Sequence, residues 1–175
     1  MLKIELQDNE YPFEYIDEHR NVVRAIIYDD EGYFYFARIH RDDIFAKDAE
    51  FIETSGGGVE QGEDLITAIK RELKEELGME VEVKEQIGIV SDYYNLINRH
   101  NINNYFLCKK ISVGDNHLTK EEANIFHLTT LKIKYDDAVK EYERCAVNGL
   151  GRLIKNRELP ILKEAYKILK TMDNA

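Results

Sequence analysis

The sequence predicts an α/β domain in which a mixed sheet carries helices on both faces. Three observations support this class. Strand-like runs of β-branched and aromatic residues dominate the first two thirds of the chain, one strongly helical segment interrupts them, and the hydrophobic period becomes helical from Asp136 onward. The resulting order is β-β-β-α-β-β-(β)-α-α, and a chain of 175 residues fits a single domain, residues 1–175.

The first two strands form a predicted hairpin. Val22–Tyr28 and Gly32–Ile39 are rich in β-branched and aromatic residues, and the turn sequence "DDEG" lies at their junction. Next, "AEFIETSGGGVEQG" predicts a short strand followed by a glycine-rich loop that carries Glu60. Because an acidic loop repels bare phosphate, we expect it to bring oxygen ligands close to a metal ion. An ordinary turn before a helix is the alternative.

The segment "EDLITAIKRELKEELGM" predicts a helix that has acidic residues in its first turn and ends at Gly78. Glu72, Glu75 and Glu76 share an arc of roughly 100° on its helical wheel, beside an apolar stripe. Like charges at this spacing cost roughly a few tenths of a kcal/mol per pair, and Arg71 is placed to pair with Glu75. The plain interpretation is a solvated acidic face. The alternative is a bound Mg²⁺ or Mn²⁺ ion, because these cations prefer carboxylate oxygens.

The second half of the chain predicts further strands and then helices. "EVEVKEQIGIVSDYY" and "INNYFLCKKISV" are predicted strands joined by the polar stretch "NLINRHN", and "ANIFHLTTLKI" predicts another short extended segment. Residues 136–172 form the predicted C-terminal helical part. We expect Asp136 or Asp137 to cap its first helix and Pro160 to begin its second, since proline suits the first turn of a helix.

The composition excludes several classes of protein. The formal net charge is −10 and no long block of Lys and Arg is present, which argues against sequence-independent binding of DNA or RNA. An acidic protein can still handle a phosphorylated small molecule when a divalent cation lies between them. No apolar run is long enough for a signal peptide or a membrane span, so we expect a cytoplasmic protein. Cys108 and Cys145 match no metal-ligand spacing and are expected to pack in the core.

The segment from Gly57 to Met79 resembles the signature of the Nudix hydrolases, the MutT-like family, which is G-x5-E-x7-R-E-U-x-E-E-x-G-U with U a bulky aliphatic residue. Every fixed position matches: Gly57, Glu63, Arg71, Glu72, Leu73, Glu75, Glu76, Gly78 and Met79. The resemblance implies the family's α/β/α sandwich, here with extra C-terminal helices. One departure is Ser55, which stands where the family often has proline.

The resemblance also implies an activity, the Mg²⁺-dependent hydrolysis of a phosphoanhydride bond in a nucleoside diphosphate linked to another moiety, with Mn²⁺ as an alternative cation. The metal ligands of the family fall on Glu72, Glu75, Glu76 and the carbonyl group of Gly57. Glu63 and Arg71 are expected to support and orient these glutamates.

We expect the attacking water to lose its proton to a carboxylate. Many family members place a glutamate from a later loop near the metals, and "LTKEEANIF" resembles that position. Glu122 is preferred over Glu121 as the base, and at most one of the two is expected to point inward. Glu75 and Glu76 are the remaining candidates, and solvated loop charges are the plain alternative.

Substrate-binding candidates lie beyond the signature. Tyr93 and Tyr94 are close to the offset at which family members that act on dinucleoside polyphosphates carry tyrosine, whereas no proline occupies the position typical of ADP-ribose hydrolases. Nucleoside triphosphates and dinucleoside polyphosphates are therefore favoured. Arg38, at the end of a predicted strand, and Arg99 and His100, in the polar loop, are candidates to contact phosphate or base.

Two other functions stay open. A nucleotide-sensing Nudix domain without catalysis would not need the three glutamates, and an isopentenyl-diphosphate isomerase would need a catalytic cysteine that no motif supports. The C-terminal helices are expected to pack on the sheet, with a lid or a homodimer surface as alternatives.

Overall fold

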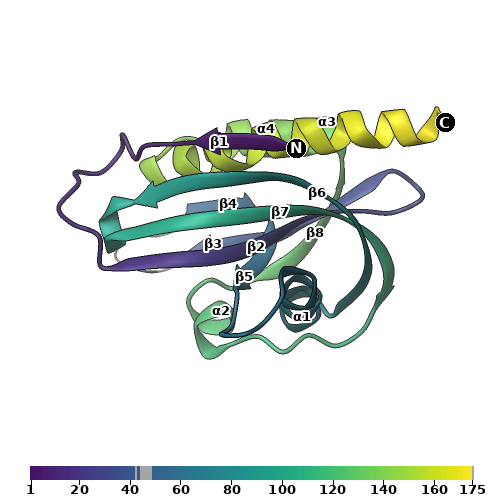
Figure 1. Cartoon of the computed structure of the whole chain (residues 1–175), viewed down its shortest axis with the longest axis horizontal. Coiled ribbons are helices and arrows are strands. Elements are labelled where there is room, and N and C mark those ends of the chain that lie inside the picture. The colour runs from purple at the N-terminus through teal and green to yellow at the C-terminus, as the bar shows by residue number, and fades with distance from the viewer. Residues whose placement is uncertain (42, 44–48, 175) are drawn as a thin grey trace.

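The computed structural model describes residues 1–41, 43 and 49–174. A central sheet lies between two helical layers, as Figure 1 shows. Helices α1 (Leu65–Leu77) and α2 (Lys120–Asn124) lie on one side, and α3 (Tyr135–Cys145) and α4 (Gly149–Asp173) lie on the other. The predicted α/β/α sandwich with C-terminal helices is therefore confirmed.

The sheet is mixed and contains eight strands within the described residues. They are β1 (Leu2–Glu5), β2 (Glu18–Tyr28), β3 (Tyr33–Arg41), β4 (Ala49–Glu53), β5 (Ser55–Gly58), β6 (Met79–Tyr94), β7 (Arg99–Val113) and β8 (Thr129–Lys134). Their order is β1-β6-β7-β2-β3-β4, with β5 paired to β2 and β8 paired to β3. The β1–β6 and β2–β7 pairs are parallel, and the other pairs are antiparallel.

Strand β2 is the centre of the sheet. It pairs with β7 along its whole length, from Glu18 opposite Arg99 to Tyr28 opposite Lys109. On its other side it pairs with β5 over Val22–Ala25 and with β3 only at its end. Its apolar side chains are buried on both faces, which explains why the run is continuous rather than alternating.

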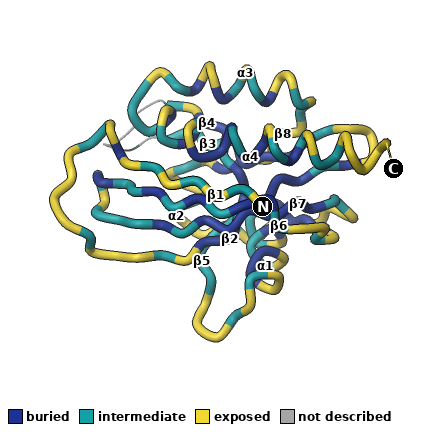
Figure 2. The backbone as a smooth tube through the Cα atoms, turned by 45° about the horizontal axis from the view of Figure 1, so that its top comes forward, coloured by how far each residue is buried: buried dark blue, intermediate teal, exposed yellow. Residues whose placement is uncertain are grey.

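Two hydrophobic cores fill the sandwich, one on each face of the sheet. The first joins the sheet to α3 and α4 and includes Phe36, Tyr142 and Leu162, and the second joins it to α1. Figure 2 shows the buried positions concentrated along the strands. Cys108 and Cys145 are buried free thiols, so the prediction of packing cysteines is confirmed. No helix among the described residues has the length and apolar character that crossing a membrane requires.

The first half of the chain corrects three predictions. Strand β1, too short to show a clear pattern, pairs with β6 and was not predicted. The glycine run forms β5 instead of a loop alone, and glycine is needed there because a Cβ on Gly56 would lie 2.0 Å from the carbonyl oxygen of Val23. Helix α1 begins at Leu65 with Asp64 as its N-cap, so its first turn contains no acidic residue.

The second half corrects the capping and helix boundaries. The N-cap of α3 is Lys134, without a side-chain cap, and Asp136 and Asp137 lie in its first turn, where the helix dipole favours them. Helix α4 begins after Asn148, whose side chain accepts a hydrogen bond from the Gly151 N–H at 2.9 Å. Pro160 lies inside α4 and does not begin it. The burial of neighbouring apolar side chains on α4 offsets the cost of an interior proline.

Candidate functional site

Capping interactions fix both ends of α1, the helix of the signature segment. At the start, the Asp64 side chain accepts hydrogen bonds from Thr67, from the backbone N–H at 2.9 Å and from the hydroxyl at 2.7 Å. At the end, Gly78 adopts a left-handed conformation with φ 65° and its N–H closes the last turn. A side chain there would collide with the carbonyl of Gly114. The apolar face of α1 is buried against the sheet, and two of its glutamates, Glu72 and Glu76, lie against β5.

Arg71 is the centre of the acidic cluster. Its guanidinium donates two hydrogen bonds to Glu63, at 2.8 and 2.9 Å, and one to Glu72 at 2.7 Å. It also reaches the Gly58 carbonyl at 3.1 Å and Glu75 at 3.4 Å. The expected pairing with Glu75 is thus only its longest contact. The hydrogen bonds from Arg71 lower the pKa of Glu63 to about 2.

Glu76 lies against the strand that precedes the helix. Its carboxylate accepts hydrogen bonds from the Ser55 hydroxyl and, at 3.2 Å, from the Gly56 N–H. Burial raises the pKa of Glu76 to about 8 in spite of these bonds, and the charge of Glu122 adds to the effect. Ser55, the residue that departs from the family pattern, is therefore a hydrogen-bond partner of a signature glutamate.

Glu72 lies directly against the glycine strand. A Cβ on Gly57 would come within 2.4 Å of the Glu72 carboxylate, so a side chain at this position would displace that carboxylate. Burial raises the pKa of Glu72, and the hydrogen bond from Arg71 opposes the shift. Glu75, with 47% of its side chain exposed, is the most accessible of the three helix glutamates.

The oxygen donors of this cluster are partly engaged by neighbouring residues. Among the described residues, no three His, Cys, Asp or Glu side chains converge as a finished metal site. Glu72 is engaged by Arg71, and Glu76 by Ser55 and Gly56. The donor chemistry nevertheless fits Mg²⁺ or Mn²⁺, because the cluster offers only oxygen ligands. A positive ion would also relieve the burial cost of the two carboxylates whose pKa is raised.

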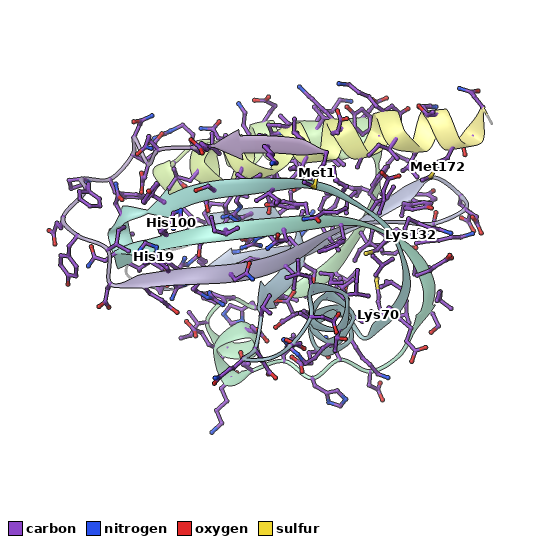
Figure 3. The ribbon with its side chains drawn as sticks, in the orientation of Figure 1. Met1, His19, Lys70, His100, Lys132 and Met172 are labelled. Atoms are coloured by element: carbon purple, nitrogen blue, oxygen red, sulfur yellow. The ribbon has the colours of Figure 1, made fainter. Side chains whose placement is uncertain are left out.

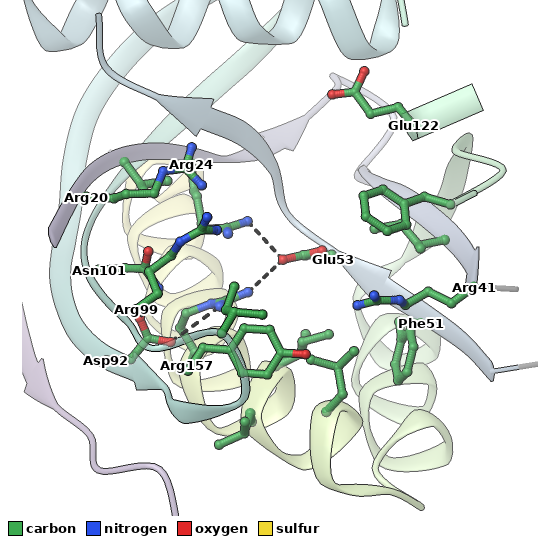
Figure 4. A pocket seen from close by; sticks show the side chains of 18 of the residues that line it. Arg20, Arg24, Arg41, Phe51, Glu53, Asp92, Arg99, Asn101, Glu122 and Arg157 are labelled. Atoms are coloured by element: carbon green, nitrogen blue, oxygen red, sulfur yellow. Dashed lines mark hydrogen bonds and ion pairs between the residues drawn. The ribbon is translucent and has the colours of Figure 1, made fainter. Parts of the chain in front are cut away.

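A cavity of about 660 Å³ opens between α2 and α4, and its lining residue Arg20 lies next to the glycine strand, since a Cβ on Gly58 would meet the Arg20 Nη2 atom at 2.8 Å. Figure 4 shows its arginines and the acidic residues between them. Five arginines line it: Arg20, Arg24, Arg41, Arg99 and Arg157. Its acidic residues are Asp43, Glu53, Asp92, Glu121 and Glu122, and its aromatic ones are Phe51, Tyr93, Tyr94 and Phe126. This concentration of arginine is unexpected in a chain of net charge −10.

The base candidates lie at the mouth of this cavity. Both Glu121 and Glu122 line it, which corrects the expectation that at most one would. They belong to α2, a short helix that was not predicted. The Glu122 carboxylate accepts a hydrogen bond from the Thr119 N–H at 2.8 Å, and the Thr119 hydroxyl accepts one from the Glu122 N–H at 3.2 Å. This capping box explains the orientation of Glu122.

Three of the five candidates for substrate contact line the cavity: Tyr93, Tyr94 and Arg99. Arg38 does not, because alternate residues of β3 face opposite sides and Arg38 pairs with Glu141 of α3 at 3.8 Å. Arg99 and His100 belong to strand β7 and not to a loop. His100 lies outside the cavity, next to His19 with 2.9 Å between their Nδ1 atoms (Figure 3).

A buried polar network behind the cavity was not predicted. Glu53 pairs with Arg24 at 3.1 Å and with Arg157 at 2.8 Å, and Arg157 also reaches Asp92 at 3.3 Å (Figure 4). The Nε atom of Arg157 is buried without a hydrogen-bond partner among the described residues. One signal was available in the sequence, since Arg24 interrupts the apolar run Val22–Tyr28 and Arg20, four residues earlier, falls on the same face of the strand.

The same network connects α4 to Thr54, the residue that precedes the glycine strand β5. Glu158 is fully buried and accepts hydrogen bonds from the backbone N–H of Thr54 at 2.7 Å and from its hydroxyl. The hydroxyls of Tyr142 and Tyr105 donate to Glu158 at 3.0 and 3.2 Å. Burial raises the pKa of both tyrosines. Glu158 of the last helix thus fixes Thr54, the residue next to Ser55.

Comparisons with known proteins bear on the whole domain. A family model described as "NUDIX domain" matches residues 18–145. Among solved structures, a NUDIX hydrolase from Nitrosomonas europaea is 15% identical, with 86% of this chain and 90% of that chain covered and a TM-score of 0.64. The MutT protein from Methanosarcina mazei Go1 is 18% identical, with 91% and 99% covered and a TM-score of 0.60. The E. coli ORF135 protein is 24% identical, with 87% and 91% covered and a TM-score of 0.56.

At these identities the structural likeness shows a shared fold. A search of curated proteins found no match. Helix α4, which supplies Arg157 and Glu158, lies beyond the matched residues.

Proposed function

This chain belongs to the Nudix family and is a pyrophosphohydrolase of the Nudix type, and from this premise we propose that it hydrolyses nucleoside triphosphates or dinucleoside polyphosphates with Mg²⁺, or alternatively Mn²⁺. The observation that carries the proposal is that Gly58 connects the Arg71 cluster to an arginine-lined cavity, because its carbonyl accepts a hydrogen bond from Arg71 and it lies next to Arg20 of the cavity lining. Carboxylate oxygens for a cation and guanidinium groups for phosphates lie next to each other there.

Each signature residue has a role in the proposal. Glu72, Glu75 and Glu76, with the carbonyl of Gly57, would hold the cation. When bound, a divalent cation neutralises the charge that develops on the phosphates and lowers the pKa of a coordinated water. Arg71 and Glu63 tie α1 to the glycine strand through the Gly58 carbonyl, which supports their positioning role.

Glu122 is the proposed general base. Water attacks phosphorus, the bond from that phosphorus to the bridging oxygen breaks, and the water proton passes to the carboxylate. The location of Glu122 at the cavity mouth and its electrostatic effect on Glu72 and Glu76 support this role. A carboxylate has two oxygens, so the hydrogen bond from Thr119 to one of them leaves the other to accept the proton.

The alternative functions have less support. An isomerase would need a reactive cysteine, and Cys108 is buried with its pKa raised to about 12 by desolvation. A sensor without catalysis would have no need for Glu122 at the mouth of the cavity. A homodimer belongs to the proposal as an alternative assembly, which light scattering on the purified protein would test.

The test is a release assay over nucleoside triphosphates, dinucleoside polyphosphates and nucleotide sugars, with Mg²⁺ and with EDTA. We expect cation-dependent release of phosphate or pyrophosphate from the first two classes. Reaction in ¹⁸O-labelled water should place the label on a phosphate product. Absence of cation-dependent turnover across the panel would overturn the proposal.

A further inference from the structure

Two arginines of the cavity wall lie diagonally across neighbouring strands. In the parallel register of β2 and β7, Glu18 faces Arg99 and Arg20 faces Asn101. The wall residues Arg20 and Arg24 on β2, and Arg99 and Asn101 on β7, all line the cavity, as expected for positions two or four residues apart. Arg20 and Arg99 therefore project from the same face of the sheet, close enough for the charge of Arg99 to contribute to lowering the pKa of Arg20.

These two arginines share one carboxylate among the described residues, which Arg99 holds with two contacts, at 2.9 and 3.0 Å. Among the described residues, the carboxylate within ion-pair distance of Arg20 is Glu18 at 3.9 Å, and Arg99 pairs with the same Glu18 at 2.9 Å. Half of the Glu18 side chain is exposed, so these pairs contribute little. Burial, together with the charges of Arg99 and Arg24, lowers the pKa of Arg20. Such a cluster is stabilised by a bound anion.

The inner arginines differ from this pair. Arg24 and Arg157 share Glu53, and both also lie within ion-pair distance of the buried Glu158, at 3.8 and 3.4 Å. Their charges are used within the protein. The arginines that line the cavity therefore form two groups. The charges of Arg24 and Arg157 are neutralised within the protein, whereas Arg20 and Arg99 form a positive edge of the cavity.

The positive edge continues from the signature loop. A Cβ on Gly58 would lie 2.8 Å from the Nη2 atom of Arg20, and the Gly58 carbonyl accepts a hydrogen bond from Arg71. Across the sheet the order is β5, β2, β7, with neighbouring strands about 4.8 Å apart. Phosphates held at Gly57 and Glu72 would thus meet Arg20 first and Arg99 one strand farther away.

We propose that Arg20 and Arg99 bind a phosphate beyond the scissile diphosphate and thereby select substrates with at least three contiguous phosphates over nucleotide sugars. The inference rests on the proposed function, which places the scissile diphosphate at the signature residues and so sets the direction in which the phosphate chain extends. A diphosphate at the signature would leave Arg99 without an anion, whereas a longer chain reaches both arginines. Charge-assisted hydrogen bonds of this kind contribute about 1.5–3 kcal/mol each, which corresponds to tenfold or more in affinity.

Calorimetry without divalent cations tests the site apart from catalysis. In EDTA, the parent protein should bind tripolyphosphate on the order of tenfold more tightly than pyrophosphate. Arg20→Gln and Arg99→Gln should each remove most of this difference. Arg144→Gln removes the same charge from the exposed surface of α3 and should leave it unchanged. Equal affinity of the parent for both anions would overturn the proposal.

Two further experiments distinguish a site for a phosphate chain from a site for isolated phosphates, and the anion site from the proposed hydrolysis. A nucleoside triphosphate should bind more tightly than a nucleoside 3′,5′-bisphosphate, and equal binding would show a site for isolated phosphates instead of a chain. With Mg²⁺, Arg20→Gln should raise KM for a triphosphate about tenfold and leave unchanged the inhibition constant of a nucleotide sugar added as a competitor. If the parent has no turnover but keeps its preference for tripolyphosphate, the proposed hydrolysis fails and the anion site stands. If it has turnover without that preference, the anion site fails alone.

Discussion

At the scale of single residues, Glu76 combines burial with two hydrogen bonds from the glycine strand. Glu76→Gln keeps the shape and removes the charge that a cation requires. Loss of an interaction next to the metal costs about 10–100-fold, and loss of a ligand should cost at least that much in kcat. Glu80→Gln removes an exposed carboxylate just beyond the helix and should behave as the parent. Parental turnover and Mg²⁺ dependence in Glu76→Gln would refute the metal assignment.

A second residue-scale prediction concerns the proton acceptor. Glu122→Gln should lower kcat by about 10²–10⁴-fold, the range expected for a general base, while Glu121→Gln is much milder. Stopped-time product assays at saturating substrate measure the effect. Because the Glu122 side chain also caps α2, the thermal unfolding of both variants is the control for local damage. Near-parental kcat in both variants would return the base role to Glu75 or Glu76.

The signature residues could be predicted because their relations are local. Spacing along one loop and one helix encodes the position of Arg71 and Glu72. Arg157 could not be predicted in the same way, since it meets Glu53 across 104 positions of sequence. Arg38 was chosen for its place at the end of a strand, but the pleat turns it to the α3 side.

At the scale of elements, α4 and the glycine strand depend on Glu158. Glu158→Gln would leave Arg24 and Arg157 with a buried charge short of a partner, and breaking a buried ion pair costs about 3–5 kcal/mol. We expect this loss in the free energy of unfolding, measured with urea. Glu164→Gln, on the more exposed side of the same helix, should change it by less than about 0.5 kcal/mol. Equal stability of the two variants would contradict the structural role.

The β2–β3 hairpin is expected to respond to acid. Burial alone would raise the pKa of Asp29, but hydrogen bonds from Tyr33, Tyr35 and Glu31 outweigh it and lower the pKa below 3.8. A lowered folded pKa contributes stability above the unfolded value, and that stability is lost as pH falls through the folded pKa. Asp29→Asn should therefore flatten the decrease in Tm between about pH 5 and pH 2. An unchanged decrease would show that other carboxylates cause it.

Element boundaries show what local patterns omit. Gly78 could be predicted as the end of α1, because a left-handed cap needs glycine. Pro160 misled the prediction of the next helix, because proline at a first turn is a common pattern and the tertiary packing of α4 overrode it. Strand β1 has only four residues and depends on β6 for its pairing, so its own sequence carries little signal.

At the scale of the whole molecule, cation binding should stabilise the fold. A ligand at 100 times its Kd adds about 2.7 kcal/mol, and each kcal/mol shifts Tm by roughly 2–4 °C for a chain of this size. Mg²⁺ should therefore raise the Tm of the parent by several degrees and leave Glu76→Gln almost unchanged. Samples without added Mg²⁺ and samples treated with EDTA provide the baseline. The same shift in both proteins would place the cation elsewhere.

The layered architecture could be predicted from the alternation of strand and helix patterns, because each pattern is local. The partners within the sheet could not, since the parallel pairing of β2 with β7 joins segments about eighty positions apart, such as Arg24 and Asn103 with 79 positions between them. The residues that line the cavity likewise come from segments far apart in the sequence. The arginines among them belong to β2, β3, β7 and α4, so no contiguous motif contains them.

The parallel pairing of β2 and β7 also bears on how the chain is made. On the ribosome, β2 emerges long before residues 99–109, and until then a strand that is apolar on both faces lacks its neighbour. Such non-local pairing slows folding, and an unpaired strand of this kind invites aggregation. The nascent chain therefore carries this vulnerable segment through nearly half of its synthesis. Newly made protein should depend on chaperones more than its modest size implies, and the arginine wall is among the last surfaces to form.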